Sequence, residues 1–352
     1  MEESKKSNPY KSILTTVVSI AIAALFMWWA LKGIEVKKIA GYFEKANYMW
    51  VFAAALFGLA AYYFRAVRWN LLLEPMGYKI SNSNAFWTIS FGYLMNLTIP
   101  RSGELARSTA LFGVEKVPVE KSFGTIILER VVDLICMVGF LGLTLLFKYE
   151  AILSFYRAVT AEKSKTAESH SNSPIYIAIA AVVLLLFLFF VFRKKLEQLS
   201  LYKKVLDFAK GILHGLTSIF KLKQKGKFVL LSLAIWISYY LAAYLVCFAL
   251  PETSDLTFAD GFFIIVVGTL GMMVPASGGI GAFHFALKLG MTALFLSMGK
   301  SAEAGAEAGL AYAFISHTMQ LVLMIVFGMI SIPVLAKARL ALSKRQKENA
   351  GI

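Results

Sequence analysis

The sequence predicts an all-α polytopic membrane protein with about six full spans, two re-entrant broken helices and an inverted repeat. The first observation is composition: 58% of the 352 residues are hydrophobic, whereas ordinary globular domains are about 45–50% apolar. The second is that apolar runs of roughly 20 residues, the length that crosses a bilayer, recur along the chain. The third is a motif, Pro-x-Ser-Gly, that occurs at residues 100–103 and again at 275–278.

The two copies of this motif predict two related halves. Residues 98–107 place three charged side chains beside a proline inside an apolar region, and residues 274–284 repeat the pattern with glycines. Backbone that is not helical is tolerated at membrane depth only where it is buried in protein or lines a wet cavity. We therefore expect two re-entrant hairpins. Because each half contains three full crossings, an odd number, the halves should have opposite orientations.

The first half is expected to contain three spans and one hairpin. Its first apolar run has no clear small-residue cleavage site, so we interpret it as a retained span and not as a signal peptide. Arg65 and Arg68 close the second span as interfacial anchors would. The elements predicted here are the cytoplasmic N-terminus 1–12, the spans 13–31, 49–73 and 122–147, and the re-entrant loop 85–112, within a repeat half of 13–147.

The second half should follow a polar, Ser-rich linker and end in a basic cytoplasmic tail. After its first span, a stretch with ten Lys or Arg residues has apolar residues at helical spacing. This pattern predicts an amphipathic helix on the cytoplasmic membrane surface. The predicted elements are the external linker 148–173, the spans 175–192, 228–250 and 309–335, the amphipathic helix 193–227, the re-entrant loop 261–298 and the tail 336–352, with the repeat half itself at 174–335.

Charge predicts orientation and partners. The net charge is +15, and the basic residues lie at the ends of apolar runs, which favours anionic lipid headgroups at the cytoplasmic surface over nucleic acid as partners. Both termini should lie in the cytoplasm, in a bacterial or archaeal type inner membrane, although residues 32–48, expected outside, carry four lysines. Cys136 and Cys247 fall inside apolar runs, so we expect packing residues and neither a disulfide framework nor a metal cluster.

Three strings of residues together resemble one family. They are Pro-Arg-Ser-Gly-Glu-Leu-Ala-Arg at 100–107, Leu-Glu-Arg-Val-Val-Asp at 128–133, and the Gly-rich string at 275–283. In this order they resemble the lysylphosphatidylglycerol synthase transmembrane, or flippase-like, family. The resemblance implies a lipid-translocating module, here in a stand-alone form without the aminoacyl transferase domain because the chain ends at Ile352. Relatives often have an acidic residue roughly where this chain has His284.

The charged residues of the first motif are candidates for headgroup binding. An ionisable side chain at membrane depth costs about 2.5–3.5 kcal/mol on insertion scales, so it should face a cavity or a partner. If a helix resumes at Pro100, then Arg101, Glu104 and Arg107 share one broad face, near unpaired N–H groups at the helix start. We hypothesise that the two arginines bind a lipid phosphate while Glu104 orients them or meets an amine. The alternative is an internal charge network with residues 128–133 that holds the hairpin to the third span.

The glycines of the second motif have two interpretations. They would let the backbone approach a headgroup closely, or they would allow tight helix packing. Ser277 with His284 suggests a hydrolase, but there is no third partner and no nucleophile-elbow motif, so we predict no catalytic residue. The candidate substrate-binding residues are Arg101, Ser102, Glu104, Arg107, Glu129, Arg130, Asp133, Pro275, Ser277, Gly278, Gly279 and His284.

The leading hypothesis is a membrane lipid transporter, a flippase or scramblase-like protein that moves a phospholipid or a polyprenyl-phosphate-linked lipid between leaflets. The sequence has no nucleotide-binding Gly-x-x-x-x-Gly-Lys-Ser/Thr string, and we expect no cofactor. One alternative is a membrane-embedded lipid headgroup transferase, although the acidic residues alternate with arginines and do not cluster as a divalent metal requires. The other is an accessory subunit of an envelope-lipid pathway. The chain is thus not expected to be an enzyme, and an oligomer is left open.

Overall fold

The computed structural model describes residues 9–33, 36–99, 101–166, 207, 210–213 and 217–349, which contain helices and no strand. Pro100, the predicted fourth span at 175–192 and most of the predicted amphipathic helix at 193–227 lie outside the described residues. The elements are α1 (Pro9–Leu31), α2 (Val36–Lys45), α3 (Tyr48–Leu73), η1 (Glu74–Met76), α4 (Asn82–Thr98), α5 (Gly103–Glu115), α6 (Val119–Phe147), α7 (Tyr149–Thr166), η2 (Ser218–Lys221), α10 (Lys225–Cys247), η3 (Pro251–Thr253), α11 (Phe258–Met273), η4 (Ser277–Gly279), α12 (Ala282–Ser297) and α13 (Ala302–Asn349).

Within the described residues, five helical stretches are long and apolar enough to cross a membrane, which confirms the predicted all-α polytopic membrane protein. Four of them correspond to the predicted spans that became α3, α6, α10 and α13. The fifth, Ser277–Ser297, forms the second arm of the second predicted hairpin, so this arm is longer than a re-entrant half-helix needs to be. The predicted first span lies within α1, whose apolar described stretch is Ile20–Leu31.

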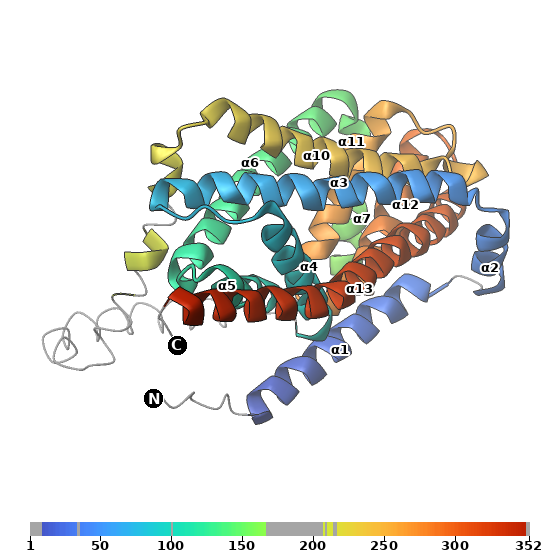
Figure 1. Cartoon of the computed structure of the whole chain (residues 1–352). Coiled ribbons are helices and arrows are strands. Elements are labelled where there is room, and N and C mark those ends of the chain that lie inside the picture. Colours follow the sequence, from blue (N-terminus) through green and yellow to red (C-terminus); the bar gives the residue numbers. More distant parts are fainter. Residues whose placement is uncertain are drawn as a thin grey trace, which may run out of the picture.

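The two halves repeat the same helix order, with α3, α4, α5 and α6 corresponding to α10, α11, α12 and α13. Helices α3 and α10 lie side by side and antiparallel (Figure 1). The backbone N–H of Asn47, before α3, donates to Ala249 O, after α10, at 2.8 Å. At the other end, Arg68 Nη1 donates to Ser232 Oγ at 3.2 Å. The antiparallel pairing gives the halves opposite orientations, as an inverted repeat requires.

Contacts between the halves are reciprocal. Helix α4 packs against α13, and its counterpart α11 packs against α6, the counterpart of α13. The ring of Phe86 lies 5.9 Å from that of Phe327 in the first pair, and Phe262 lies 6.3 Å from Phe147 in the second. Such reciprocity, in which one patch contacts another and its counterpart does the same, is the property of a twofold axis. The chain therefore contains an internal twofold relation between its halves.

Short polar signals and glycines fix the hairpins. Ser81 is the N-cap of α4, and its hydroxyl accepts from Ser83 N at 3.2 Å, which pairs one of the first N–H groups of the helix. In the hairpin, α4 and α5 approach so closely that a Cβ at Gly103 would collide with Gly92 O. Helix α11 begins with a capping box of Thr257 and Asp260.

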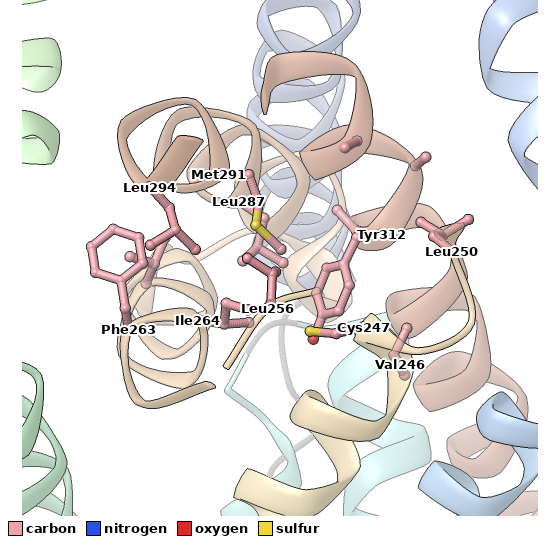
Figure 2. Packing of buried hydrophobic residues seen from close by; sticks show 14 of the residues in the cluster. Val246, Cys247, Leu250, Leu256, Phe263, Ile264, Leu287, Met291, Leu294 and Tyr312 are labelled. Carbon is pink, nitrogen blue, oxygen red and sulfur yellow. The ribbon is translucent and has the colours of Figure 1, made fainter. Parts of the chain in front are cut away.

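The second half encloses the largest apolar core (Figure 2). Side chains from four helices converge there: Cys247 of α10, Phe263 of α11, Leu287 of α12 and Tyr312 of α13, each almost fully buried. The Tyr312 hydroxyl donates to Ala243 O at 2.7 Å, so this buried polar group is satisfied. The same core includes Ala54 of α3 and Ala151 of α7, so it joins these helices to the second half.

Two predicted connecting regions are more ordered than polar composition suggests. Residues 149–166 of the predicted linker form α7, which packs on α12 and contributes buried Ala151 to the large apolar core. The ring of Phe155 lies 6.1 Å from that of Phe263 of α11. The predicted tail continues α13 to Asn349. Its Ala, Leu, Lys and Arg residues are strong helix formers, which explains why the helix continues beyond the apolar stretch.

Candidate functional site

Seven charged side chains from three helices of the first half form one connected group, hereafter the charged cluster. Helices α3, α5 and α6 bring them together, and each member lies within ion-pair distance of another member. The cluster consists of Arg65, Arg68, Glu104, Arg107, Glu129, Arg130 and Asp133.

Arg65 and Arg68 hold α3 to α6. Arg65 Nη2 lies 3.0 Å from Asp133 Oδ2, and Arg68 Nη2 lies 3.0 Å from Asp133 Oδ1. Arg65 is 2% exposed and Arg68 is 0% exposed, so the prediction that they are interfacial anchors is wrong. Their spacing of three residues puts both on the face of α3 that meets α6. The complementary spacing of Glu129 and Asp133, four residues apart on α6, is the sequence signal that could have indicated the pairing.

Arg107 holds α5 to α6. Its Nη1 lies 2.7 Å from Glu129 Oε2, and its guanidinium carbon lies 3.5 Å from the centroid of the Trp69 ring. The Trp69 indole N–H in turn donates to Thr125 Oγ1 at 2.8 Å. Stacking on an aromatic face and pairing with a carboxylate together fix the guanidinium in one orientation. The internal charge network that was the alternative to headgroup binding is therefore present.

Glu104 and Arg130 form the exposed rim of the charged cluster. Glu104 Oε1 lies 3.4 Å from Arg130 Nη2, and the side chains are 27% and 48% exposed. Both line a recess between α4, α5 and α6 that contains about 260 Å³ of empty space. The residues around the recess are Ile89, Gly92, Tyr93, Asn96, Gly103, Glu104, Arg107 and Arg130.

Arg101 lies apart from the charged cluster. It has a left-handed backbone conformation, with φ of 59°, and precedes α5, which begins at Gly103. The prediction that Arg101, Glu104 and Arg107 share one helix face is thus wrong, because the helix starts later than Pro100. Arg101 Nη2 instead donates to Met273 O, at the end of α11, at 2.8 Å.

Ser277 makes the matching contact from the other hairpin. Its hydroxyl donates to Leu97 O, near the end of α4, at 2.6 Å. The last carbonyls of a helix have no partner within that helix, so each hairpin supplies a donor to the end of the other. These two bonds, Arg101 to Met273 and Ser277 to Leu97, are hereafter the reciprocal bonds. Ser102 behaves differently, because its hydroxyl donates to Met95 O and Ile99 O within its own hairpin.

The remaining predicted residues belong to the second loop and its surroundings. Gly278 and Gly279 have φ of 59° and 77°, after Pro275, a conformation that glycine adopts without strain. A Cβ at Gly278 would lie 2.8 Å from the Leu97 side chain, which agrees with tight packing between the hairpins. His284 is 3% exposed and lies with its ring 4.4 Å from Phe314. It packs on α13, where its ring also lies 5.2 Å from that of His317, and these contacts are away from the charged cluster.

Asn96 is a residue of the recess that the sequence did not indicate. Its side-chain oxygen accepts from Gly103 N at 2.7 Å, so the first N–H of α5 is already used inside the protein. A ligand in the recess would therefore meet the side chains of Glu104, Arg107 and Arg130 and not this N–H. In the part of the chain that the structure describes, no three His, Cys, Asp or Glu side chains gather as metal ligands.

Comparison with known proteins identifies a family and several relatives with similar sequences. Residues 16–328 match the family described as lysylphosphatidylglycerol synthase TM region. A glycosyltransferase, AglD, of Haloferax volcanii is 24% identical over 90% of this chain, and the chain spans 52% of that relative's length. A UPF0104 membrane protein of Methanocaldococcus jannaschii is 25% identical over 34% of the chain and 37% of its own length. Another, of Pyrococcus horikoshii, is 23% identical over 39% of the chain and 41% of its own length.

Proposed function

This chain belongs to the lysylphosphatidylglycerol synthase TM region family, and from that premise we propose that it moves a lipid between the two leaflets of a membrane. The cargo in this proposal is a phospholipid or a polyprenyl-phosphate-linked lipid. The observation that carries the proposal is the contact between two broken hairpins of opposite orientation, beside a charged recess. In secondary transporters built as inverted repeats, the substrate site lies where the broken elements meet.

The proposed mechanism uses the recess for the headgroup and leaves the acyl chains in the bilayer. Arg107, fixed by Glu129 and Trp69, and Arg130 at the rim offer donors that suit phosphate oxygens. The reciprocal bonds hold the hairpins together, and opening the path to the other leaflet would break both. The neutral bond from Ser277 contributes about 0.5–1.5 kcal/mol net and the bond from the charged Arg101 about 1.5–3 kcal/mol. Thermal motion can open a closure of this strength.

A second candidate function rests on the name of one relative. The Haloferax volcanii protein is named a glycosyltransferase, which keeps a lipid headgroup transferase as the alternative. The match covers 52% of that protein, so the transfer of its activity to this chain is a proposal only. A headgroup transferase would form a new covalent product, which a transporter does not. An accessory role in an envelope-lipid pathway would give neither movement nor product.

Reconstitution into liposomes tests the leading proposal. Labelled phosphatidylglycerol, phosphatidylethanolamine and a polyprenyl phosphate are placed in one leaflet, and their accessibility to a membrane-impermeant quencher is followed. The native chain is compared with Arg107→Gln and with Asp255→Asn, a control that alters an exposed ion pair with Lys300 away from the charged cluster. We expect one lipid to move with the native chain and the control, and not with Arg107→Gln. Product formation detected by mass spectrometry would favour the transferase, and no movement of any lipid would refute the transporter.

A further inference from the structure

The charged cluster contains four arginines and three carboxylates among the described residues, so it has one net positive charge. A charge at membrane depth is costly unless a partner neutralises it. Asp133 is shared by Arg65 and Arg68, each at 3.0 Å. The excess positive charge is therefore spread over several arginines and does not belong to a single side chain. The two arginines that reach the recess are Arg107 and Arg130, and Glu104 is the carboxylate that faces them there. The recess is thus the exposed end of a cation-rich group.

Several donors of the charged cluster are buried and unused. Arg107 Nη2 and Nε have no hydrogen-bond partner, although Arg107 is only 4% exposed. On the acceptor side, Glu104 Oε2 is also without a partner. A buried N–H left without an acceptor costs about 1–3 kcal/mol as a general rule. Arg107 therefore has buried N–H groups without an acceptor at the wall of the recess, and Arg130 supplies the accessible cation there.

We infer that the recess binds the phosphate of a headgroup with one net negative charge, a phosphodiester monoanion, and that this phosphate displaces Glu104 from Arg130. The inference rests on the proposed function and names its substrate class. The two unesterified oxygens of a phosphodiester can accept from both arginines. Neutralising the single excess charge is what distinguishes this headgroup from the others.

The contact that the phosphate replaces is the pair at the exposed rim of the charged cluster. The Glu104–Arg130 distance of 3.4 Å is longer than the 2.7 Å of Arg107–Glu129, and both rim side chains are accessible. Arg130 also lies 3.6 Å from Asp133, so it keeps a partner when Glu104 leaves. The buried pairs stay in place and the rim pair exchanges.

The recess is open at its rim, where the Arg130 side chain is 48% exposed. A headgroup bound there would place its phosphate beside Arg107 and Arg130, with the substituents of the phosphate next to the same charges. Selection would then depend on the net charge of the whole headgroup.

Charge sets the expected order of headgroups. A zwitterionic headgroup leaves the excess positive charge unneutralised, and a cationic one adds to it. A dianionic phosphate monoester leaves one negative charge in excess. Because the interaction takes place in a partly dry site, where charges interact more strongly than in water, we expect a preference for the monoanion of about tenfold or more.

Direct binding tests this order without requiring transport. The purified full chain in nanodiscs is titrated with phosphatidylglycerol, a monoanion, with phosphatidylethanolamine, a zwitterion, and with phosphatidic acid, whose monoester is mainly dianionic at pH 8. Inorganic phosphate and soluble glycerophosphoglycerol serve as competitors that separate recognition of the lipid from recognition of a free phosphate group. Competition by the soluble diester at the lipid's own concentration would overturn the assignment to a lipid headgroup.

Variants that change the charge of the rim should change the preference and not merely weaken binding. Glu104→Gln raises the net charge by one, so the preference should move to phosphatidic acid. Arg130→Gln lowers it by one, so the preference should move to phosphatidylethanolamine. The double variant restores the native net charge and should restore selection of phosphatidylglycerol. Asp255→Asn is the matched control, and the elution volume in size-exclusion chromatography verifies folding.

The outcomes separate this inference from the proposed function. Selective binding of the monoanion without movement in liposomes would support the recess and refute the transporter. Movement of lipids with equal binding of all three headgroups would support the transporter and overturn the charge rule. A uniform loss of binding in both single variants, without the opposite shifts in preference, would also overturn it.

Discussion

The two halves of this protein place the same four helices around interiors of opposite character. In the first half, α3, α5 and α6 surround the charged cluster, in which Arg68 and Glu129 are fully buried. In the second half, α10, α11, α12 and α13 surround an apolar core (Figure 2). Buried ion pairs can often be replaced by packed apolar side chains without loss of stability. Among the described residues of the second half, the buried carboxylate is Asp260, which pairs with Lys148 at 2.7 Å. The same helix arrangement therefore forms with far fewer buried charges than the first half contains.

The largest expected loss of stability comes from removing one partner of a buried ion pair in the charged cluster. Glu129→Ala removes the partner of Arg107 and leaves a buried guanidinium without its carboxylate. We expect the free energy of unfolding to fall by about 3–5 kcal/mol, measured by denaturant titration in lipid micelles. The exposed pair of Asp255 and Lys300 supplies the control, since Asp255→Ala should cost at most about 1 kcal/mol. Equal losses of stability in the two variants would contradict the conclusion that the pairs of the charged cluster are buried and the Asp255–Lys300 pair is exposed.

The apolar half should be sensitive to volume and not to charge. Leu287 is 1% exposed in the second core, and Leu287→Ala should lower the free energy of unfolding by about 2–5 kcal/mol through the cavity that it leaves. Among molecules that remain folded, the headgroup preference should stay that of the native chain. A changed preference would show that the second core takes part in recognition.

A smaller effect is expected where the two hairpins touch. Ser277→Ala removes the donor to Leu97 O and should lower the free energy of unfolding by about 0.5–1.5 kcal/mol. The same change should make the closure easier to open, so lipid movement in liposomes should become faster. Slower movement in folded protein would indicate that this bond belongs to the substrate path and not to the closure.

The smallest effect on stability is predicted when a buried ion pair of the charged cluster is replaced by two apolar side chains. Arg107→Met combined with Glu129→Leu removes both partners of a buried pair, so no isolated charge remains. Such replacements are often neutral or stabilising by about 1–4 kcal/mol. We therefore expect unfolding close to that of the native chain and loss of headgroup binding. Retained binding would assign the pair a structural role alone.

The sequence was sufficient for the helical class, most spans and the repeat. Periodic apolar runs predict α3, α6, α10 and α13, and the repeated Pro-x-Ser-Gly motif locates both hairpins. A hydropathy profile, however, considers each span separately. It therefore predicts interfacial anchors for the arginines near the end of α3, because the carboxylates that pair with them belong to another helix, α6. Arg65 is the clearest case, since only the tertiary contact with Asp133 explains its burial.

The sequence also did not predict the backbone conformation of the first hairpin. The face assigned to Arg101 depended on where α5 begins, and a shift of the helix start to Gly103 sends the side chain to Met273 O. Helix starts are set by caps and by packing, here by the contact of Gly103 with Asn96. The recess could not be predicted for the same reason. Asn96, which lines it and bonds Gly103 N, carries no charge and does not stand out in an apolar segment.

The reciprocal packing of α4 on α13 and of α11 on α6 also has an evolutionary consequence. It is the arrangement that two identical chains would adopt as an antiparallel pair. In such a pair every substitution appears twice, so a residue useful in one copy is imposed on the other. Joining the copies into one polypeptide removes this constraint. The two copies can then diverge in sequence, and the charged cluster of the first half and the apolar core of the second half differ in this way.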